Sequence, residues 1–176
     1  AHGVAQRRCR YNDRGQVLEQ ADYDLKGNLR PSDPSGTARY VFTYDALGRQ
    51  TDVSFLDSLN RPVAKEGYLC GSHTEYAPDG SVSLQQQFSI KDGKKHISYE
   101  ERKGKDWQRT TFDDGQVRID STDSRGRTTF YGLYDAEGNL VNNSDGYACQ
   151  MISYRDTPGH CHIQRTNFDQ YRNNTY

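Results

Sequence analysis

Two histidines on either side of a cysteine form the most site-like cluster of the sequence, at Gly159-His160-Cys161-His162-Ile163. Side chains two residues apart in a β-strand share a face, so His160 and His162 would point one way and Cys161 the other. Imidazole pairs bind zinc or copper, but such a site needs a third or fourth ligand, which the spacing does not identify. The sequence therefore favours a surface strand with solvent-facing histidines, and it predicts no resident metal or cofactor.

The single tryptophan, Trp107, lies near Lys105 and Arg109 and is the strongest candidate for contact with a partner. Tryptophan, tyrosine and arginine are favoured in binding surfaces, because they combine a large apolar area with a polar end. A core position for Trp107 is the alternative. Four tyrosines that lie outside the aromatic repeat described below are further candidates for such a surface: Tyr40, Tyr68, Tyr131 and Tyr147.

The motifs and the charge balance exclude several classes of function. The chain has no Gly-x-Ser-x-Gly nucleophile motif and no phosphate-binding glycine loop, so we expect no catalytic residues and no enzyme activity. Its 176 residues carry 23 Lys and Arg against 24 Asp and Glu, which gives no excess of cations for nucleic acid. No apolar run approaches the roughly 20 residues of a membrane-spanning helix.

Four cysteines occur without any Cys-x-x-Cys pair, which disfavours zinc ribbons and thioredoxin-like sites. We expect two disulfides, Cys149–Cys161 and Cys9–Cys70, because Cys149 and Cys161 flank a predicted tight turn. Four reduced thiols that pack as small apolar groups are the alternative. The disulfides, together with an opening that is typical of a chain cut by signal peptidase, predict a secreted or periplasmic protein.

An aromatic residue, an acidic residue and a glycine recur along the whole chain. The clearest copies have the form Tyr-Asp-x-x-Gly and begin at Tyr23, Tyr44 and Tyr134. A glycine stands eight or nine residues before every other aromatic anchor. This second layer predicts one repeat domain over residues 1–176, with about five units that start near these glycines: Gly3, Gly36, Gly67, Gly104 and Gly146.

The chemistry of the repeat predicts β-hairpins. The aspartate can accept backbone N–H groups at the start of a turn, and the glycine can take the left-handed conformation that closes it. The flanking segments carry β-branched and aromatic residues, as in residues 39–44 and 51–55, which is typical of strands. We therefore expect an all-β fold, an antiparallel meander of tandem hairpins that forms a twisted or spiralling sheet, with the repeat tyrosines stacked on one another.

The Tyr-Asp-x-x-Gly-Asn cores at residues 23–28 and 134–139 resemble the bacterial YD-repeat family, the tyrosine–aspartate repeats of Rhs-type and wall-associated toxins. They also resemble the short β-hairpin repeats of the MORN-like antitoxin-component type. The resemblance implies a spiralling all-β sheet, a secreted or cell-envelope setting, and binding or encapsulation rather than catalysis. The chain differs in being too short to enclose a toxin and in lacking the aspartyl self-cleavage segment of the Rhs core.

These observations together predict a protein-binding repeat module of bacterial origin, of the inhibitor or immunity type, whose partner is a toxin or an envelope enzyme. A carbohydrate-binding module for cell-wall or host glycans is the second interpretation, based on the surplus of aromatic residues. A metal-dependent enzyme built on His160 and His162 is the third.

Overall fold

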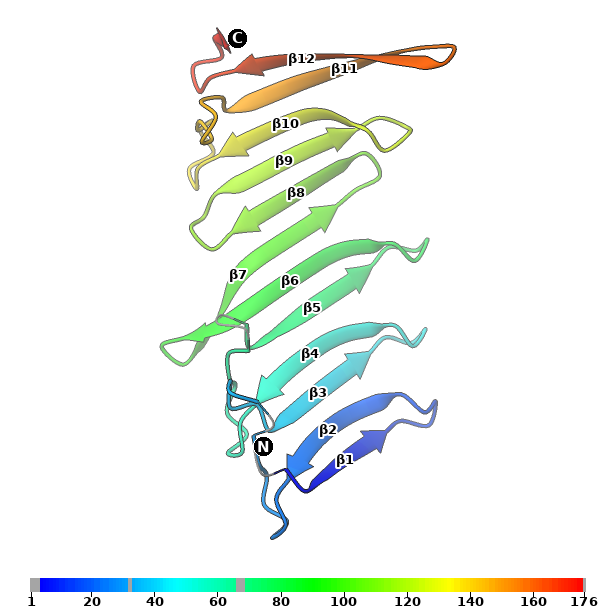
Figure 1. The fold of residues 1–176 in the computed structure, drawn as a ribbon, viewed down its shortest axis with the longest axis vertical. Helices are drawn as coiled ribbons and strands as arrows, with labels where there is room; N and C mark the ends of the chain where they lie inside the picture. The colour runs from blue at the N-terminus through cyan, green and yellow to red at the C-terminus, as the bar shows by residue number, and fades with distance from the viewer. Residues whose placement is uncertain (1–3, 32, 66–68, 176) are drawn as a thin grey trace. The chain divides into compact units, whose positions relative to one another are not determined.

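The computed structural model describes residues 4–31, 33–65 and 69–175. Thirteen strands form one antiparallel meander sheet in chain order, and the sheet is not closed (Figure 1). The predicted all-β hairpin meander is therefore confirmed, and no helix in the described ranges is long and apolar enough to cross a membrane. The strands are β1 Gln6–Tyr11, β2 Val17–Tyr23, β3 Arg39–Tyr44, β4 Gln50–Leu56, β5 Gly71–Tyr76, β6 Val82–Lys91, β7 Lys94–Lys103, β8 Trp107–Phe112, β9 Val117–Thr122, β10 Thr128–Tyr134, β11 Cys149–Thr157, β12 His160–Phe168 and β13 Asn174–Thr175.

Contacts divide the chain into two compact units, unit 1 (Ala1–Ser98) and unit 2 (Tyr99–Tyr176). The boundary falls within β7, so unit 1 holds β1 to β6 and unit 2 holds β8 to β13. Two of the predicted repeat starts, Gly3 and Gly67, lie outside the described residues. Gly36 and Gly146 each close a turn with positive φ (86° and 85°), whereas Gly104 precedes β8 without such a φ.

The turns form through the hydrogen bonds that the repeat predicts. The Asp45 carboxylate accepts the N–H groups of Leu47 (3.0 Å) and Arg49 (2.9 Å), and Gly48 takes a φ of 84°. Two backbone bonds close the loop, from Asp45 N to Arg49 O and from Gly48 N to Asp45 O. The same pair of backbone bonds closes the turns that begin at Asn12, Asp24, Asp57, Asp123, Asp135, Asn143 and Asp169.

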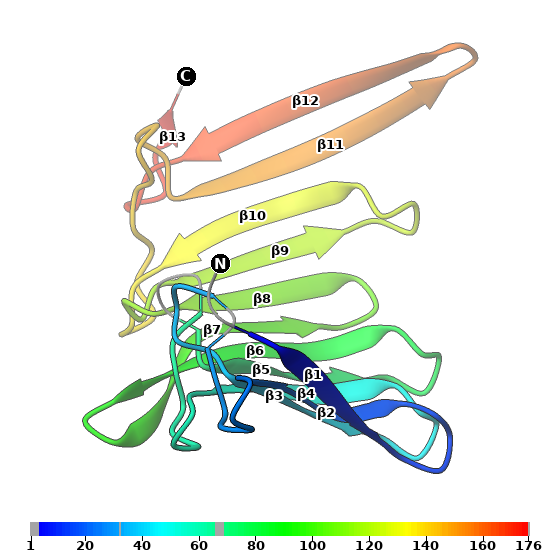
Figure 2. The same ribbon diagram turned by 60° about the horizontal axis from the view of Figure 1, so that its bottom comes forward.

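A long connector follows β2, β4 and β10, and each connector folds back before the next hairpin begins. Figure 2 shows the connectors after β2 and β4 side by side at one end of unit 1, where Val63 of the second approaches Gly36 of the first. Each connector ends on a small buried residue, Ala38 (0% exposed), Cys70 (4%) or Ala148 (0%). Backbone bonds hold these residues between two strands, as when Asp22 N donates to Ala38 O and Ala38 N donates to Leu56 O. The core therefore lies where the connectors meet the sheet.

Successive hairpins within a unit are joined by short stretches of backbone pairing. Residues 19–21 pair with 39–41, residues 52–54 with 71–73, and residues 130–132 with 149–151. Beyond each stretch a repeat tyrosine completes the contact, because its hydroxyl donates to a carbonyl of the preceding hairpin: Tyr44 to Val17 (2.8 Å), Tyr76 to Gln50 (2.9 Å) and Tyr154 to Thr128 (2.8 Å). The predicted stacking of repeat tyrosines is thus replaced by hydroxyl-to-carbonyl bonds between hairpins.

Arginines at the ends of two turns reinforce the tyrosine contacts. The Arg49 guanidinium lies 4.4 Å from the centre of the Tyr76 ring, and Arg127 lies 4.2 Å from that of Tyr154. Asp45 and Asp123 hold these two arginines at 2.7 Å and 2.8 Å. A repeat turn therefore shapes its own hairpin and also presents a cation to the tyrosine of the next hairpin.

Replacing Tyr44 with Phe removes the hydroxyl that bonds to Val17 O while keeping the ring. We expect the free energy of unfolding to fall by about 1 kcal/mol, the usual net value of one such hydrogen bond. Chemical denaturation in urea measures the change. Tyr11→Phe is the matched control, because the Tyr11 hydroxyl has no bond to another hairpin in the described part of the chain. Equal losses in the two variants would contradict the assigned role of the hydroxyl.

Asp45→Asn keeps the turn acceptor but removes the charge, as the chain itself does at Asn12. The N–H groups of Arg49 and Leu47 and the Arg49 guanidinium hold the pKa of Asp45 below its ordinary value. The folded state therefore binds fewer protons than the unfolded state, so this stabilisation is complete above about pH 5 and is lost as pH falls through the folded pKa. We expect the urea midpoint to decline less for the variant than for the parent between pH 6 and pH 2.5. An identical decline would contradict this assignment.

Candidate functional site

Unit 2 has a covered face, which carries a polar network. The connector places Tyr147 edge-on against Tyr131 of β10, with ring centres 6.1 Å apart. Beneath them Arg118 donates two bonds to Asp120 (2.8 Å and 2.9 Å), and the Asp120 side chain is almost fully buried. Desolvation and the nearby Glu101 carboxylate raise the pKa of Tyr99 to about 12. The groups on this face are satisfied by one another.

The opposite side of the same strands, here called the open face of unit 2, carries large apolar side chains. Cross-strand register places Trp107 beside Ser121, Ser121 beside Phe130, and Phe130 beside Met151. The next row runs from Arg109 through Ile119 and Gly132 to Cys149. Trp107 is 43% exposed and Met151 57% exposed. The open face is defined by Trp107, Arg109, Ile119, Phe130, Tyr134 and Met151.

Two glycines set the aromatic rings of the open face. A Cβ at Gly132 would lie 2.9 Å from the Phe130 ring and 3.0 Å from the Tyr134 ring, so both rings lean over this glycine. A Cβ at Gly104 would lie 2.0 Å from Trp107 Nε1, so the indole lies directly against the backbone at that point. Glycine lets rings pack flat on a strand where any side chain would displace them. The result is a partly exposed aromatic surface that is fixed in place.

The residues predicted as contact candidates separate into distinct environments. Trp107 and Arg109 are exposed on the open face, whereas Tyr131 and Tyr147 meet on the covered face. Tyr40 is half-buried in unit 1, where its ring meets Phe55 edge-on at 5.6 Å and its hydroxyl accepts a bond from Lys65 Nζ (2.9 Å). Tyr68 lies outside the described residues.

Sequence reasoning missed three members of the open face, namely Ile119, Phe130 and Met151. Phe130 and Tyr134 stand two residues to either side of Gly132, and this alternation on one strand is the signal that could have found them. The pairing of Phe130 with Met151 depends on a connector of 14 residues between β10 and β11, which the sequence alone did not place.

The two histidines predicted as weak metal candidates lie on β12 and are exposed. Their cross-strand neighbours are Thr157 and Arg155, neither of which is a usual metal ligand. No group of three or more His, Cys, Asp and Glu residues that could hold a metal occurs in residues 4–31, 33–65 and 69–175.

A histidine–aspartate pair lies on an exposed part of unit 1. His73 Nδ1 is 2.7 Å from Asp52 Oδ1, and Thr43 donates to the other oxygen of that carboxylate. Burial opposes ionisation of Asp52, but the bonds from Thr43 and His73 prevail and lower its pKa. The pair joins β4 to β5, because Asp52 and His73 are direct cross-strand partners. Its evident role is to link two hairpins.

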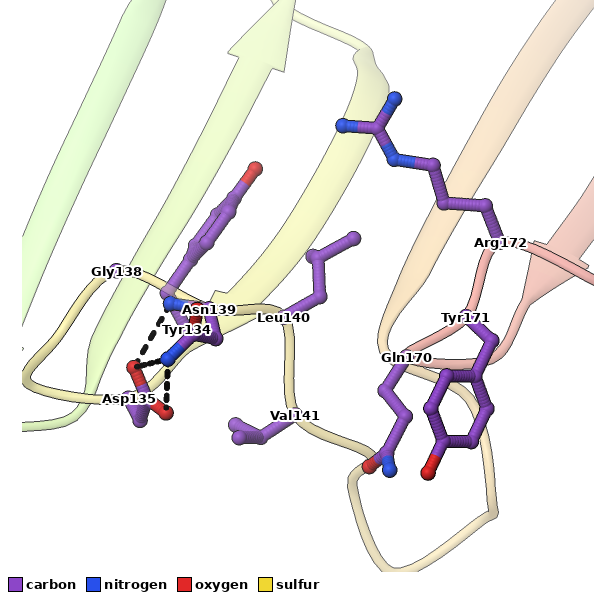
Figure 3. Close-up of a pocket in the computed structure, with 9 residues that line it drawn as sticks. All are labelled: Tyr134, Asp135, Gly138, Asn139, Leu140, Val141, Gln170, Tyr171 and Arg172. Carbon is purple, nitrogen blue, oxygen red and sulfur yellow. Dashed lines mark hydrogen bonds between the residues drawn. The ribbon is translucent and has the colours of Figure 1, made fainter.

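Figure 3 shows a pocket of about 540 Å³ in unit 2, between the connector after β10 and the turn before β13. Leu140 and Val141 line one side, and Tyr171 with Arg172 lines the other. The nearby Asp135 carboxylate is already bonded to the Asn139 side chain and backbone, and these bonds lower its pKa. The pocket therefore offers apolar surface and a cation rather than a free acid or base.

The structure contradicts the predicted disulfides, because all four cysteines have free thiols. Cys161 pairs with Asp156 near the tip of the β11–β12 hairpin, whereas Cys149 pairs with Phe168 seven residues farther along β11. Seven residues of strand span roughly 23 Å, far beyond the Cα separation of about 4.4–6.8 Å that a disulfide needs. Cys9 lies in β1 and Cys70 just before β5, with three strands between them. The disulfide argument for export is therefore removed.

A scan against protein-family models finds no match, and a search of the curated proteins finds none either. The resemblance to tyrosine–aspartate repeats therefore stays a prediction that rests on the turn cores.

The four thiols should differ in reactivity. Cys9 and Cys161 are exposed, whereas Cys70 and Cys149 are buried, so two thiols should react quickly with an aromatic disulfide reagent and two only on unfolding. A hydrogen bond to Asp156 and the charge of its carboxylate raise the pKa of Cys161. Asp156→Asn should therefore lower that pKa and speed alkylation of Cys161 near pH 8, as followed by peptide mass spectrometry. Fewer than two fast thiols, or no gain in rate, would contradict the assignment.

Proposed function

We propose that the chain is a protein-binding repeat module and that the open face of unit 2 is its principal contact surface. The observation that carries the proposal is the row of Trp107, Phe130 and Met151 across β8, β10 and β11, on the face opposite the polar network. Tryptophan, methionine, phenylalanine and arginine are enriched where proteins meet. Arg109 borders the row and adds a donor for a partner's carboxylates or carbonyls.

The rigidity of the surface supports this role. Gly104 and Gly132 fix the Trp107, Phe130 and Tyr134 rings against the sheet, so little side-chain freedom remains to be lost when a partner binds. An exposed tryptophan in the centre of such a row has the features of an interface hot spot. The more specific form of the proposal is an inhibitor or immunity-type protein whose open face covers a toxin or an envelope enzyme, without catalysis of its own.

A photo-crosslinking amino acid at position 151 tests the proposal, because Met151 is exposed on the open face. The matched control places the same amino acid at position 25, since Leu25 is 94% exposed at a turn of unit 1. Cells or extracts of the source would be irradiated, and adducts would be identified by mass spectrometry. We expect one discrete protein adduct from position 151 that is absent from position 25 and falls at least fivefold when Trp107→Ala is added.

Equal adducts from both positions would contradict the proposal, since they would show contact without selectivity. A glycan array provides the second arm. Binding of a glycan that Trp107→Ala abolishes, with no protein adduct at position 151, would replace the proposal with the carbohydrate-binding interpretation.

A further inference from the structure

Four strands of the chain begin in the same way, and one of them has no neighbour on its outer side. In each, a small residue donates its N–H to the end of the partner strand, and a tyrosine follows six residues later. The donors are Ala5, Ala38, Cys70 and Ala148, with N···O distances of 2.8, 2.9, 2.7 and 2.7 Å, and the tyrosines are Tyr11, Tyr44, Tyr76 and Tyr154. Strand β1 is therefore built like β3, β5 and β11, the strands that receive a preceding hairpin.

Exposure shows that the outer side of β1 is uncovered. Ala5 is exposed, whereas its counterparts Ala38 and Ala148 are fully buried. Tyr11 is 56% exposed, and every residue of β1 is exposed. No strand within residues 4–31, 33–65 and 69–175 pairs with the outer edge of β1, which Figure 1 shows at the edge of unit 1. This edge is half of a hairpin junction.

The complete junctions show which backbone groups β1 offers. Asp22 N donates to Ala38 O, so the alternation of an antiparallel ladder makes Gln20 and Tyr40 the central hydrogen-bonded pair. Arg7 holds the position of Tyr40, two residues after the small residue. The carbonyl of Ala5 and both backbone groups of Arg7 therefore face outward.

Charge indicates the kind of strand that fits. In both junctions of unit 1 the preceding strand supplies a carboxylate, Glu19 to Arg39 (3.1 Å) and Asp52 to His73 (2.7 Å). On β1 the position of His73 is held by Arg8, which stacks on the Tyr23 ring and bonds to the Gln6 amide oxygen. An acidic residue on an incoming strand would therefore meet a cation opposite it.

We infer that the outer edge of β1 binds an extended, acidic strand of a partner protein by strand addition, with residues 6–8 pairing to three residues of that strand and its carboxylate opposite Arg8. The Tyr11 hydroxyl then donates to a carbonyl of the incoming strand, as Tyr44 does to Val17. A second copy of this chain fits poorly. The free edge of its β12 offers Gln164, Arg165 and Thr166, so arginine would oppose arginine.

A synthetic peptide with the sequence of β4, Gln-Thr-Asp-Val-Ser-Phe-Leu, serves as the probe, because it carries the acid that faces His73 in the intact junction. Titration of the full chain would be followed by NMR at the amides of residues 5–11. We expect saturable shifts confined to β1 and its turn. A peptide with Asn in place of its Asp should bind two- to fivefold more weakly, as should the parent peptide to Arg8→Ala.

Two controls make the result decisive. A peptide methylated on the central valine nitrogen cannot form the backbone pair, so its binding should be lost. Trp107→Ala alters the open face of unit 2 and should leave peptide affinity unchanged, so this inference and the proposed function can fail separately. No shifts at β1, or equal affinity for the methylated peptide, would overturn the inference.

Discussion

Short backbone ladders between hairpins are the constraint on which the rest of the structure depends. Three residue pairs join each hairpin to the next at the junctions after β2, β4 and β10. A ladder of that length leaves the far ends of the strands without backbone partners, and buried polar groups without partners are costly. The tyrosine hydroxyl resolves this at one carbonyl per junction, and the turn arginine fixes the tyrosine ring. The repeat therefore encodes the joining of hairpins as much as their turns.

The same junctions explain where burial occurs. A connector must fold back and end between two strands, which leaves room only for Ala38, Cys70 or Ala148. Because connectors fill the side that carries Tyr131 and Tyr147 in unit 2, the other side of those strands keeps its large apolar residues at the surface. The proposed contact surface thus follows from the arrangement that gives the sheet its core.

Sequence reasoning predicted the fold well and the site only in part. The Tyr-Asp-x-x-Gly pattern specified the turns because the roles of Asp45 and Gly48 are local and act within five residues. Trp107 and Arg109 were recognised as exposed candidates by residue type, whereas Phe130 and Met151 depend on cross-strand register. The disulfide prediction was wrong because closeness to a turn in sequence was taken as closeness in space. In an antiparallel hairpin only equal distances from the turn bring residues together, and Cys149 and Cys161 lie at unequal distances.

Native-state amide hydrogen exchange by NMR tests the short-ladder junction most directly. Tyr40, Ser72 and Gln150 occupy the central pair of their junctions, whereas Phe42, Thr74 and Ile152 lie two residues farther along the same edge, beyond the pairing. The account predicts strong protection at the first three amides and fast exchange at the second three. Equal protection at both sets would show a continuous ladder between hairpins and would contradict the account.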